Sequence, residues 1–136
     1  MKPMSDEFVD SNIVVYALGD GPKASAARQI LYAGVIISAQ VLNEVLNVLR
    51  RKQRLDWPDI HERLALLHDA MPIVPLTFEV HRQGVWLAER YGLSTYDAMI
   101  AAAARHAGCA VLWSEDLQDG LVLEGQVTVR NPFLNG

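Results

Sequence analysis

The sequence predicts an α/β fold made by one domain over residues 1–136, in which helices connect the strands of a mostly parallel sheet. Short β-rich segments recur along the chain, and each is too continuously apolar for a sheet with one face in water. The segments between them are long enough for helices, and strands connected in this way pair in parallel. No repeat and no linker rich in Pro, Gly or Ser divides the chain.

The expected elements alternate in chain order. Strands are expected at 8–9, 35–37, 73–74, 111–113 and 127–129, and helices at about 11–18, 22–33, 39–53, 56–70, 77–91 and 94–107. In the third helix, an apolar face is predicted on one side and a polar stripe on the other, which contains Gln40, Asn43, Glu44, Asn47 and Arg51. Glu44 is therefore expected to face away from the core side of its own helix.

Composition excludes several classes of protein. The chain is 51% hydrophobic, carries a formal charge of −4 and has one cysteine, Cys109, so it can form neither an internal disulfide nor a cysteine zinc site. We expect a cytoplasmic protein without contact to a membrane, because the longest apolar run, 30–37, is far too short to span a bilayer and no export signal is visible. The acidic balance also argues against binding nucleic acid by bulk charge, so such a role must be local or metal-assisted.

Acidic residues follow two of the predicted strands. Asp10 comes directly after Phe8-Val9, and Asp116 comes three residues after Trp113. Ligands of open parallel sheets bind beyond the carboxyl ends of the strands, so these two acids are expected at one edge. Taken singly, each has a plainer explanation: Asp10 can cap a helix, and Asp116 and Asp119 can serve a turn.

Two further acids complete the candidate site. Glu44 lies on a helix and can be explained as part of a solvated face. Asp97 stands three residues after Ser94, the spacing of a capping box, where the helix dipole keeps a carboxylate ionised. Together the four acids suit a hard divalent cation, which takes oxygen ligands. Without them the chain would hold equal numbers of acidic and basic residues.

At this point the sequence resembles a known family, the PIN-domain ribonucleases, and most closely the VapC-type toxins of toxin–antitoxin pairs. The opening strand and helix of the family resemble residues 8–17, and its helix with an acidic residue resembles residues 38–44. Its third acidic block is similar to residues 93–98, and its last strand and acid to residues 112–116. Order and spacing agree over nearly the whole chain.

The resemblance implies a three-layer α/β/α fold around a parallel sheet of about five strands, and an endoribonuclease that depends on Mg²⁺ or Mn²⁺. It also implies an RNA substrate, a small antitoxin partner that covers the active site, and a homodimer. The acidic metal ligands and catalytic residues would be Asp10, Glu44, Asp97 and Asp116, with Asn12 and Ser114 in support. Glu115 and Asp119 remain alternatives to Asp116 as the last acid.

A basic cluster follows the helix that bears Glu44. Arg50, Arg51, Lys52 and Arg54 could contact the phosphates of RNA, and the alternative is favourable placement of cations at a helix C-terminus. The tryptophans could stack on bases, although packing in the core or at an interface explains them equally. The alanine run 101–104 predicts the close approach of another element, for which a second copy of the chain is a candidate.

Alternative functions are less well supported by the sequence. A phosphoryl-accepting receiver or dehalogenase-like phosphatase also places acids at strand ends, but those families need a late lysine, and the last lysine here is Lys52. No histidine pair at i, i+4 predicts zinc, and no nucleophile elbow is present. The non-enzymatic alternative is an inactive PIN-like module that binds RNA or protein.

Overall fold

A computed structural model describes residues 5–134 and contains a four-stranded and a two-stranded sheet. The larger sheet has the order β1-β4-β6-β5, and its strands are β1 (Glu7–Val9), β4 (Val111–Trp113), β6 (Val127–Arg130) and β5 (Val122–Leu123). All neighbours in it are parallel except the β5–β6 pair. The smaller sheet pairs β2 (Ile37–Ser38) with β3 (Ile73–Val74) in parallel, and a bridge between Phe8 and Ile36 connects it to β1.

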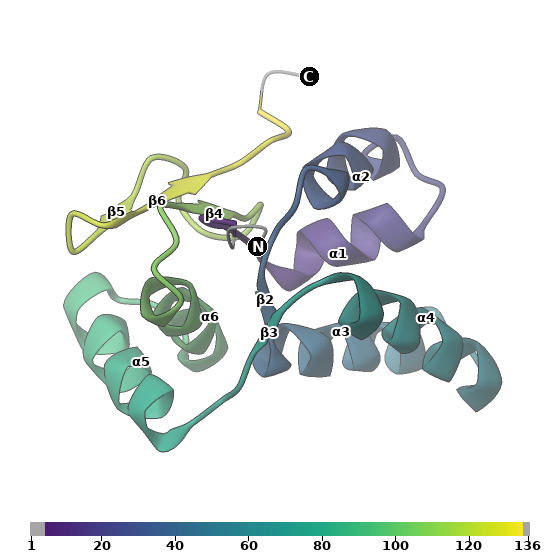
Figure 1. The fold of residues 1–136 in the computed structure, drawn as a ribbon, viewed down its shortest axis with the longest axis horizontal. Helices are drawn as coiled ribbons and strands as arrows, with labels where there is room; N and C mark the ends of the chain where they lie inside the picture. The colour runs from purple at the N-terminus through teal and green to yellow at the C-terminus, as the bar shows by residue number, and fades with distance from the viewer. Residues whose placement is uncertain (1–4, 135–136) are drawn as a thin grey trace.

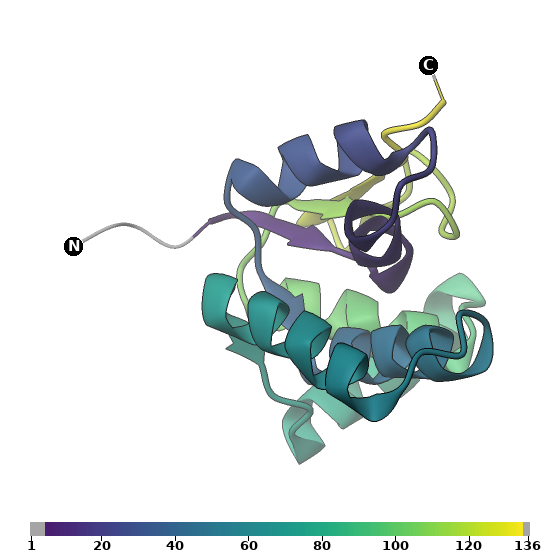
Figure 2. The same cartoon turned by 90° about the vertical axis from the view of Figure 1, so that its right-hand side faces the viewer.

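Helices cover both sides of the strands. In Figure 2, α2 lies on one side and α3 to α6 lie on the other, while Figure 1 shows α1 between α2 and α3. The bounds are α1 (Ser11–Leu18), α2 (Ala24–Tyr32), α3 (Ala39–Arg51), α4 (Trp57–Ala70), α5 (Phe78–Tyr91) and α6 (Thr95–His106). The α/β class and the layered arrangement of helices around a mostly parallel sheet are therefore confirmed.

The strand count differs slightly from the expected five. Strand β5 was not predicted, because two residues are too short to show a periodic pattern and Val122 is exposed. A tight turn joins β5 to β6, in which Glu124 and Gly125 both have positive φ and the backbone N–H of Gln126 donates to the carbonyl of Leu123. The turn, and not the strand pattern, creates this hairpin.

Helix α3 follows its predicted pattern with one difference. Val41, Val45 and Leu49 are fully buried, as the apolar face requires. Gln40, placed on the polar stripe, is only 8% exposed. Its side-chain amide donates to Glu44 at 3.1 Å at the edge of the pocket described below.

The alanine run lies inside this chain's own core. Ala101 to Ala104 are all buried, so these side chains are not available to a second copy, and that part of the expectation is wrong. The element that approaches is α5, where a Cβ on Gly84 would lie 2.6 Å from Sδ of Met99 on α6. Whether the protein dimerises through another surface stays a prediction.

Several other residues are placed plainly. Cys109 is buried, and burial raises the pKa of its thiol to about 11. Trp113 packs against the core, whereas Trp57 and Trp86 are about half exposed. Over residues 5–134, no helix is long and apolar enough to cross a membrane.

Candidate active site

Asp10 and Ser114 meet because their strands are neighbours. Val9 of β1 pairs with Trp113 of β4, so the next residue of each strand emerges at the same edge. The Ser114 hydroxyl donates to Oδ2 of Asp10 at 2.7 Å. Asp10 also caps α1, since its Oδ1 accepts from the backbone N–H of Ser11 at 2.7 Å. The capping explanation of Asp10 is thus correct, and the same carboxylate lies at the site.

The Asn12 side chain connects two acids. Its amide nitrogen donates to Oδ2 of Asp10 at 3.3 Å and to Oδ2 of Asp116 at 3.1 Å. Its carbonyl oxygen accepts from the backbone N–H of Glu115 at 3.1 Å. The Ser114 hydroxyl in turn accepts from the backbone N–H of Asp116 at 3.2 Å. Asn12 and Ser114 therefore hold the loop after β4 against the start of α1.

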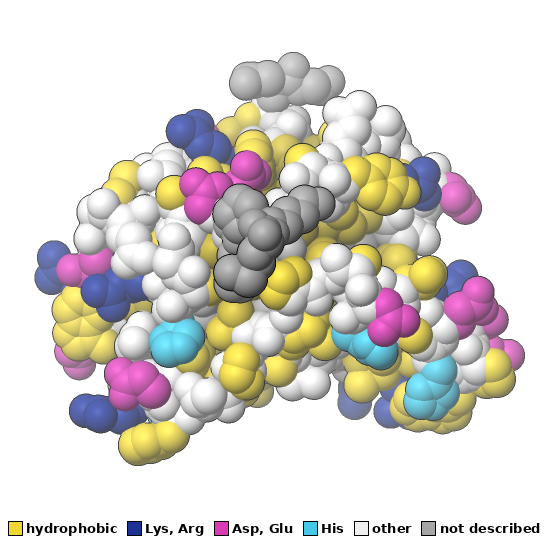
Figure 3. Space-filling model, viewed as in Figure 1, with side chains coloured by type: hydrophobic (Ala, Val, Ile, Leu, Met, Phe, Trp, Pro, Cys, Tyr) yellow, Lys and Arg dark blue, Asp and Glu magenta, His cyan; other side chains and the backbone are white. Residues whose placement is uncertain are grey.

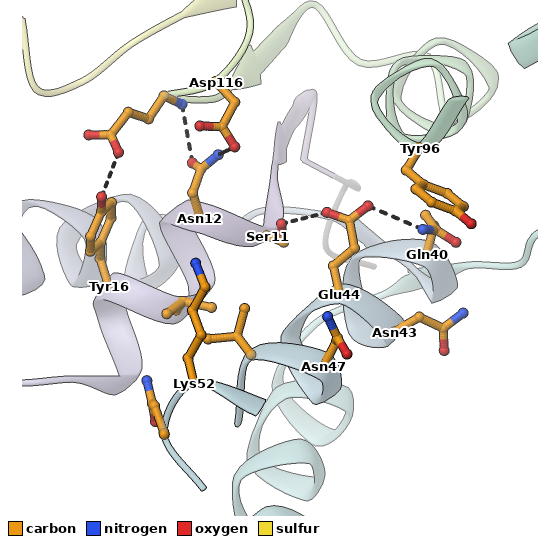
Figure 4. A pocket seen from close by; sticks show the side chains of 14 residues that line it. Ser11, Asn12, Tyr16, Gln40, Asn43, Glu44, Asn47, Lys52, Tyr96 and Asp116 are labelled. Atoms are coloured by element: carbon orange, nitrogen blue, oxygen red, sulfur yellow. Dashed lines mark hydrogen bonds between the residues drawn. The ribbon is translucent and has the colours of Figure 1, made fainter. Parts of the chain in front are cut away.

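Glu44 reaches the same region from α3. Its Oε1 accepts from the Ser11 hydroxyl at 2.8 Å, and its Oε2 accepts from the Gln40 amide at 3.1 Å (Figure 4). The sequence analysis did not select Ser11 or Gln40 as site residues. Gln40 could have been found from its i, i+4 spacing to Glu44, and Ser11 from its place next to Asp10.

Asp97 lies in the first turn of α6, where its backbone N–H donates to the Ser94 hydroxyl at 3.3 Å. The predicted cap is therefore present. Among the described residues no hydrogen bond joins the Asp97 carboxylate to the other three acids, and its charge is the smallest of the causes that raise the pKa of Asp10. The place of Asp97 in the acidic site therefore stays a prediction.

The pKa of Asp10 is raised from its ordinary value of 3.8 to about 6. Burial is the largest cause, since the residue is 1% exposed, and the charges of Glu44 and Asp97 add to it. Hydrogen bonds from Ser114 and Ser11 act in the opposite direction. A cation bound at this edge would offset both the cost of burying the Asp10 charge and its repulsion by Glu44 and Asp97.

The donor set fits a magnesium-like ion only in part. Carboxylate oxygens are the ligands that such ions prefer, and Asp10, Asp116 and Glu44 are joined through Asn12 and Ser11. However, within the described residues no group of three or more His, Cys, Asp or Glu side chains is arranged to hold a metal ion. A divalent cation bound here would therefore need further ligands such as water or a substrate phosphate.

The loop after β4 contains three acids with different partners. Glu115 accepts from the Tyr16 hydroxyl at 2.5 Å and forms an ion pair with Lys23, and these bonds lower the pKa of Glu115. Asp119 accepts from the backbone N–H of Asn131 at 2.8 Å. Asp116 is the acid that shares Asn12 with Asp10.

Glu44, Glu115 and Asp116 line an open pocket of about 860 Å³ between α1, α3, the start of α6 and the loop after β4, whereas Asp10 and Asp97 are not part of its lining. Glu44 lies near its centre in Figure 4, with Tyr96 beyond Gln40 and Lys52 on the opposite side. Among the members of the basic cluster, Lys52 lines the pocket. Arg50 instead lies over the Trp57 ring at 4.5 Å, and Arg51 and Arg54 are exposed elsewhere.

The surface carries no broad basic area on the face shown in Figure 3, where Lys and Arg side chains are scattered toward the rim. This agrees with the formal charge of −4.

With this geometry in view, comparison with known proteins defines the family. The sequence pattern of the PIN domain matches residues 8–118, and the chain belongs to the PIN-domain family. No curated protein matches the chain in sequence.

Solved structures share the fold over most of its length. A toxin–antitoxin complex from Klebsiella pneumoniae has a TM-score of 0.72 at 21% identity, covering 93% of this chain and 98% of that one. The VapC20 toxin of Mycobacterium tuberculosis, which cleaves the sarcin–ricin loop, has a TM-score of 0.64 at 21% identity and covers 81% and 91%. DNA-bound VapBC from Salmonella typhimurium has a TM-score of 0.67 at 17% identity and covers 95% and 99%.

Proposed function

We propose that this protein is a metal-dependent endoribonuclease and the toxin of a toxin–antitoxin pair. The observation that carries the proposal is the link through Asn12 between buried Asp10, whose pKa is raised, and Asp116 at one sheet edge, with Glu44 joined to the same place through Ser11. Membership of the PIN family, whose VapC members are nucleases, supports the same activity.

In this proposal, Asp10, Glu44, Asp97 and Asp116 hold Mg²⁺ or Mn²⁺. Asp116 is chosen over its neighbours because Glu115 is already paired with Lys23 and Tyr16, and Asp119 binds the backbone of Asn131. When bound, the metal would lower the pKa of a coordinated water and offset charge on the phosphoryl group.

The chain's own residues would position the reactants. Hydrogen bonds from Asn12 and Ser114 hold the carboxylates of Asp10 and Asp116 near each other. Ser11 and Gln40 each donate to one oxygen of Glu44. Among the described residues that line the pocket, Lys52 is the one cation, and its ammonium would attract a phosphate.

The proposal includes an antitoxin partner, a homodimer and a cytoplasmic location. The neighbours from Klebsiella and Salmonella are toxin–antitoxin assemblies, which supports a partner that covers this pocket. The buried thiol of Cys109 is compatible with a reducing compartment.

A second function has one observation in its favour. Because no ready-made group of three metal ligands occurs over residues 5–134, the domain could bind RNA or protein without cleaving it. The two functions differ in whether the protein binds a metal ion and cleaves RNA when the metal is present.

The test is an RNA cleavage assay with the purified protein freed of any bound inhibitor. We expect cleavage of a structured or an unstructured RNA with Mg²⁺ or Mn²⁺, and loss of cleavage with EDTA and in Asp97→Asn. Cleavage that persists in EDTA, or equally in the variant, would contradict a metal-dependent site. Absence of cleavage together with absence of metal binding would favour the binding module.

A further inference from the structure

We propose that the α3 side of the pocket is a base-reading surface for an unpaired RNA segment, formed by Asn43, Asn47 and Tyr96 with Lys52 at one end. This inference rests on the proposed ribonuclease function and names the form of its substrate. It concerns side chains that the acidic site does not use.

The two asparagines lie on the same face of α3, four residues apart. Both are exposed and line the pocket beside Glu44. In the part of the chain that the structure describes, neither side chain makes a hydrogen bond. Gln40 differs, since its amide is buried and bonded to Glu44. The amides of Asn43 and Asn47 are thus free to bind a ligand, whereas the neighbouring Gln40 amide is already bonded to Glu44.

An amide suits a nucleobase better than it suits a phosphate. It presents a donor and an acceptor side by side, and asparagine pairs in this way with adenine through two hydrogen bonds. A phosphate would use only the donor half of each amide and gains most from positive charge, which Lys52 carries at one end of this wall. The chemistry of the wall therefore selects base edges, with adenine as the expected preference.

Tyr96 gives this surface an aromatic ring. Its side chain is 64% exposed, lines the pocket and lies beyond Gln40 in Figure 4. An exposed aromatic ring at a polar pocket offers a face on which a base can stack. Tyr96 directly precedes Asp97, so a stacked base would lie next to the acidic cluster.

Lys52 lies at the opposite end. From Gln40 to Lys52 the axis of α3 advances about 18 Å, the length of several stacked nucleotides at about 3.4 Å each. Ring, amides and ammonium thus follow one line along the helix, with Glu44 beside it.

This arrangement requires an unpaired strand. In an A-form duplex the base edges of the major groove are beyond the reach of side chains, whereas loops and single strands expose them. The acids would act on the backbone, while α3 would hold the bases.

The experiment compares the full-length protein with Asn43→Ala/Asn47→Ala, using Gln29→Ala on α2 as a matched exposed-amide control. Binding is measured by fluorescence anisotropy in EDTA with four single-stranded RNA oligonucleotides that differ in the base of one short run. Cleavage of a random-sequence RNA pool with Mg²⁺ or Mn²⁺ is read by sequencing in parallel. Thermal unfolding confirms that each variant is folded.

We expect the wild type and Gln29→Ala to prefer adenine, and the double variant to lose about 5- to 100-fold in affinity for that RNA while its preference flattens. Tyr96→Leu should weaken the binding of all four RNAs, whereas Tyr96→Phe, which keeps the ring, should bind them as the wild type does. Equal binding of all bases by the wild type, or an unchanged preference in the double variant, would overturn the inference. A protein that shows the preference but cleaves nothing would instead contradict the proposed nuclease.

Discussion

The two sides of the pocket differ in how their polar side chains are used. On the side made by β1, α1 and the loop after β4, hydrogen bonds through Asn12 and Ser114 join the acids to one another and to the backbone. On the α3 side, Asn43 and Asn47 project into the pocket without such bonds to the described residues. In the proposed function, the fixed side would position the groups that act on a phosphate, and the open side would supply the adaptable groups that recognise the RNA.

The largest expected effect separates two adjacent acids of the fixed side. Asp116→Asn should lower RNA cleavage by about 100-fold or more, because it removes a proposed metal ligand that Asn12 joins to Asp10. Glu115→Gln should retain most of the activity, because Glu115 is paired with Lys23 and Tyr16. Initial cleavage rates at saturating metal measure both, and the reverse order would show that Glu115 is the ligand.

The second prediction concerns Asp10 and pH. Its pKa in the folded protein, about 6, lies above the ordinary 3.8, so the folded state holds the proton more tightly than the unfolded state does. This contribution to stability is complete below about pH 3.8 and is lost as pH rises through about 6, and it amounts to about 3 kcal/mol.

Urea unfolding in EDTA at about pH 4 and about pH 7 tests this prediction. As pH rises from about 4 to about 7, the free energy of unfolding of Asp10→Asn should increase relative to that of the wild type by about that amount. A difference between the two proteins that is independent of pH would contradict the raised pKa.

A smaller effect is expected at the contact between the two sides. The Ser11 hydroxyl donates to Glu44 at 2.8 Å, so Ser11→Ala should leave one carboxylate oxygen without its donor. We expect roughly 10-fold weaker metal-dependent cleavage, with recovery in Ser11→Thr, which keeps a hydroxyl. The same loss in both variants would assign the effect to packing, because only Ser11→Thr can replace the bond.

The smallest expected effect lies at the open end of the α3 side. Lys52→Gln should weaken RNA binding by up to about fivefold and reduce its salt dependence, since Lys52 lines the pocket. Arg51→Gln, one residue earlier and outside the pocket lining, is the matched control. RNA-binding isotherms of both variants at two salt concentrations test this prediction. Equal losses in Lys52→Gln and Arg51→Gln would mean that the basic cluster acts as a general surface charge.

Much of the fold could be predicted from the sequence because buried parallel strands and amphipathic helices have distinct periods. The pattern of α3 and the cap at Asp10 were of this kind. Strand β5 could not be predicted, because its pairing depends on a turn with positive φ at Glu124 and Gly125. The alanine run showed that a close neighbour exists, but only the packing of α5 identified it.

The proximity of Asp10 to Asp116 could be predicted from the sequence, but the hydrogen-bond network around them could not. Strand order places Asp10 near the loop after β4, so the neighbourhood of Asp10 and Asp116 follows from topology. The contacts of Ser11 and Gln40 with Glu44 depend on how α3 packs against α1, which no local pattern contains. For the same reason the partners of Glu115, which argue for Asp116 as the last acid, were not visible in the sequence.

The most direct test of the central claim is a calorimetric titration of the metal-free protein with Mn²⁺, made in parallel for the wild type and Asp97→Asn. The account predicts binding to the wild type, a rise in its thermal stability with metal concentration, and at least about 10-fold weaker binding in the variant. A wild type that gives neither binding heat nor stabilisation, or a variant that binds equally well, would contradict a metal site formed by these acids.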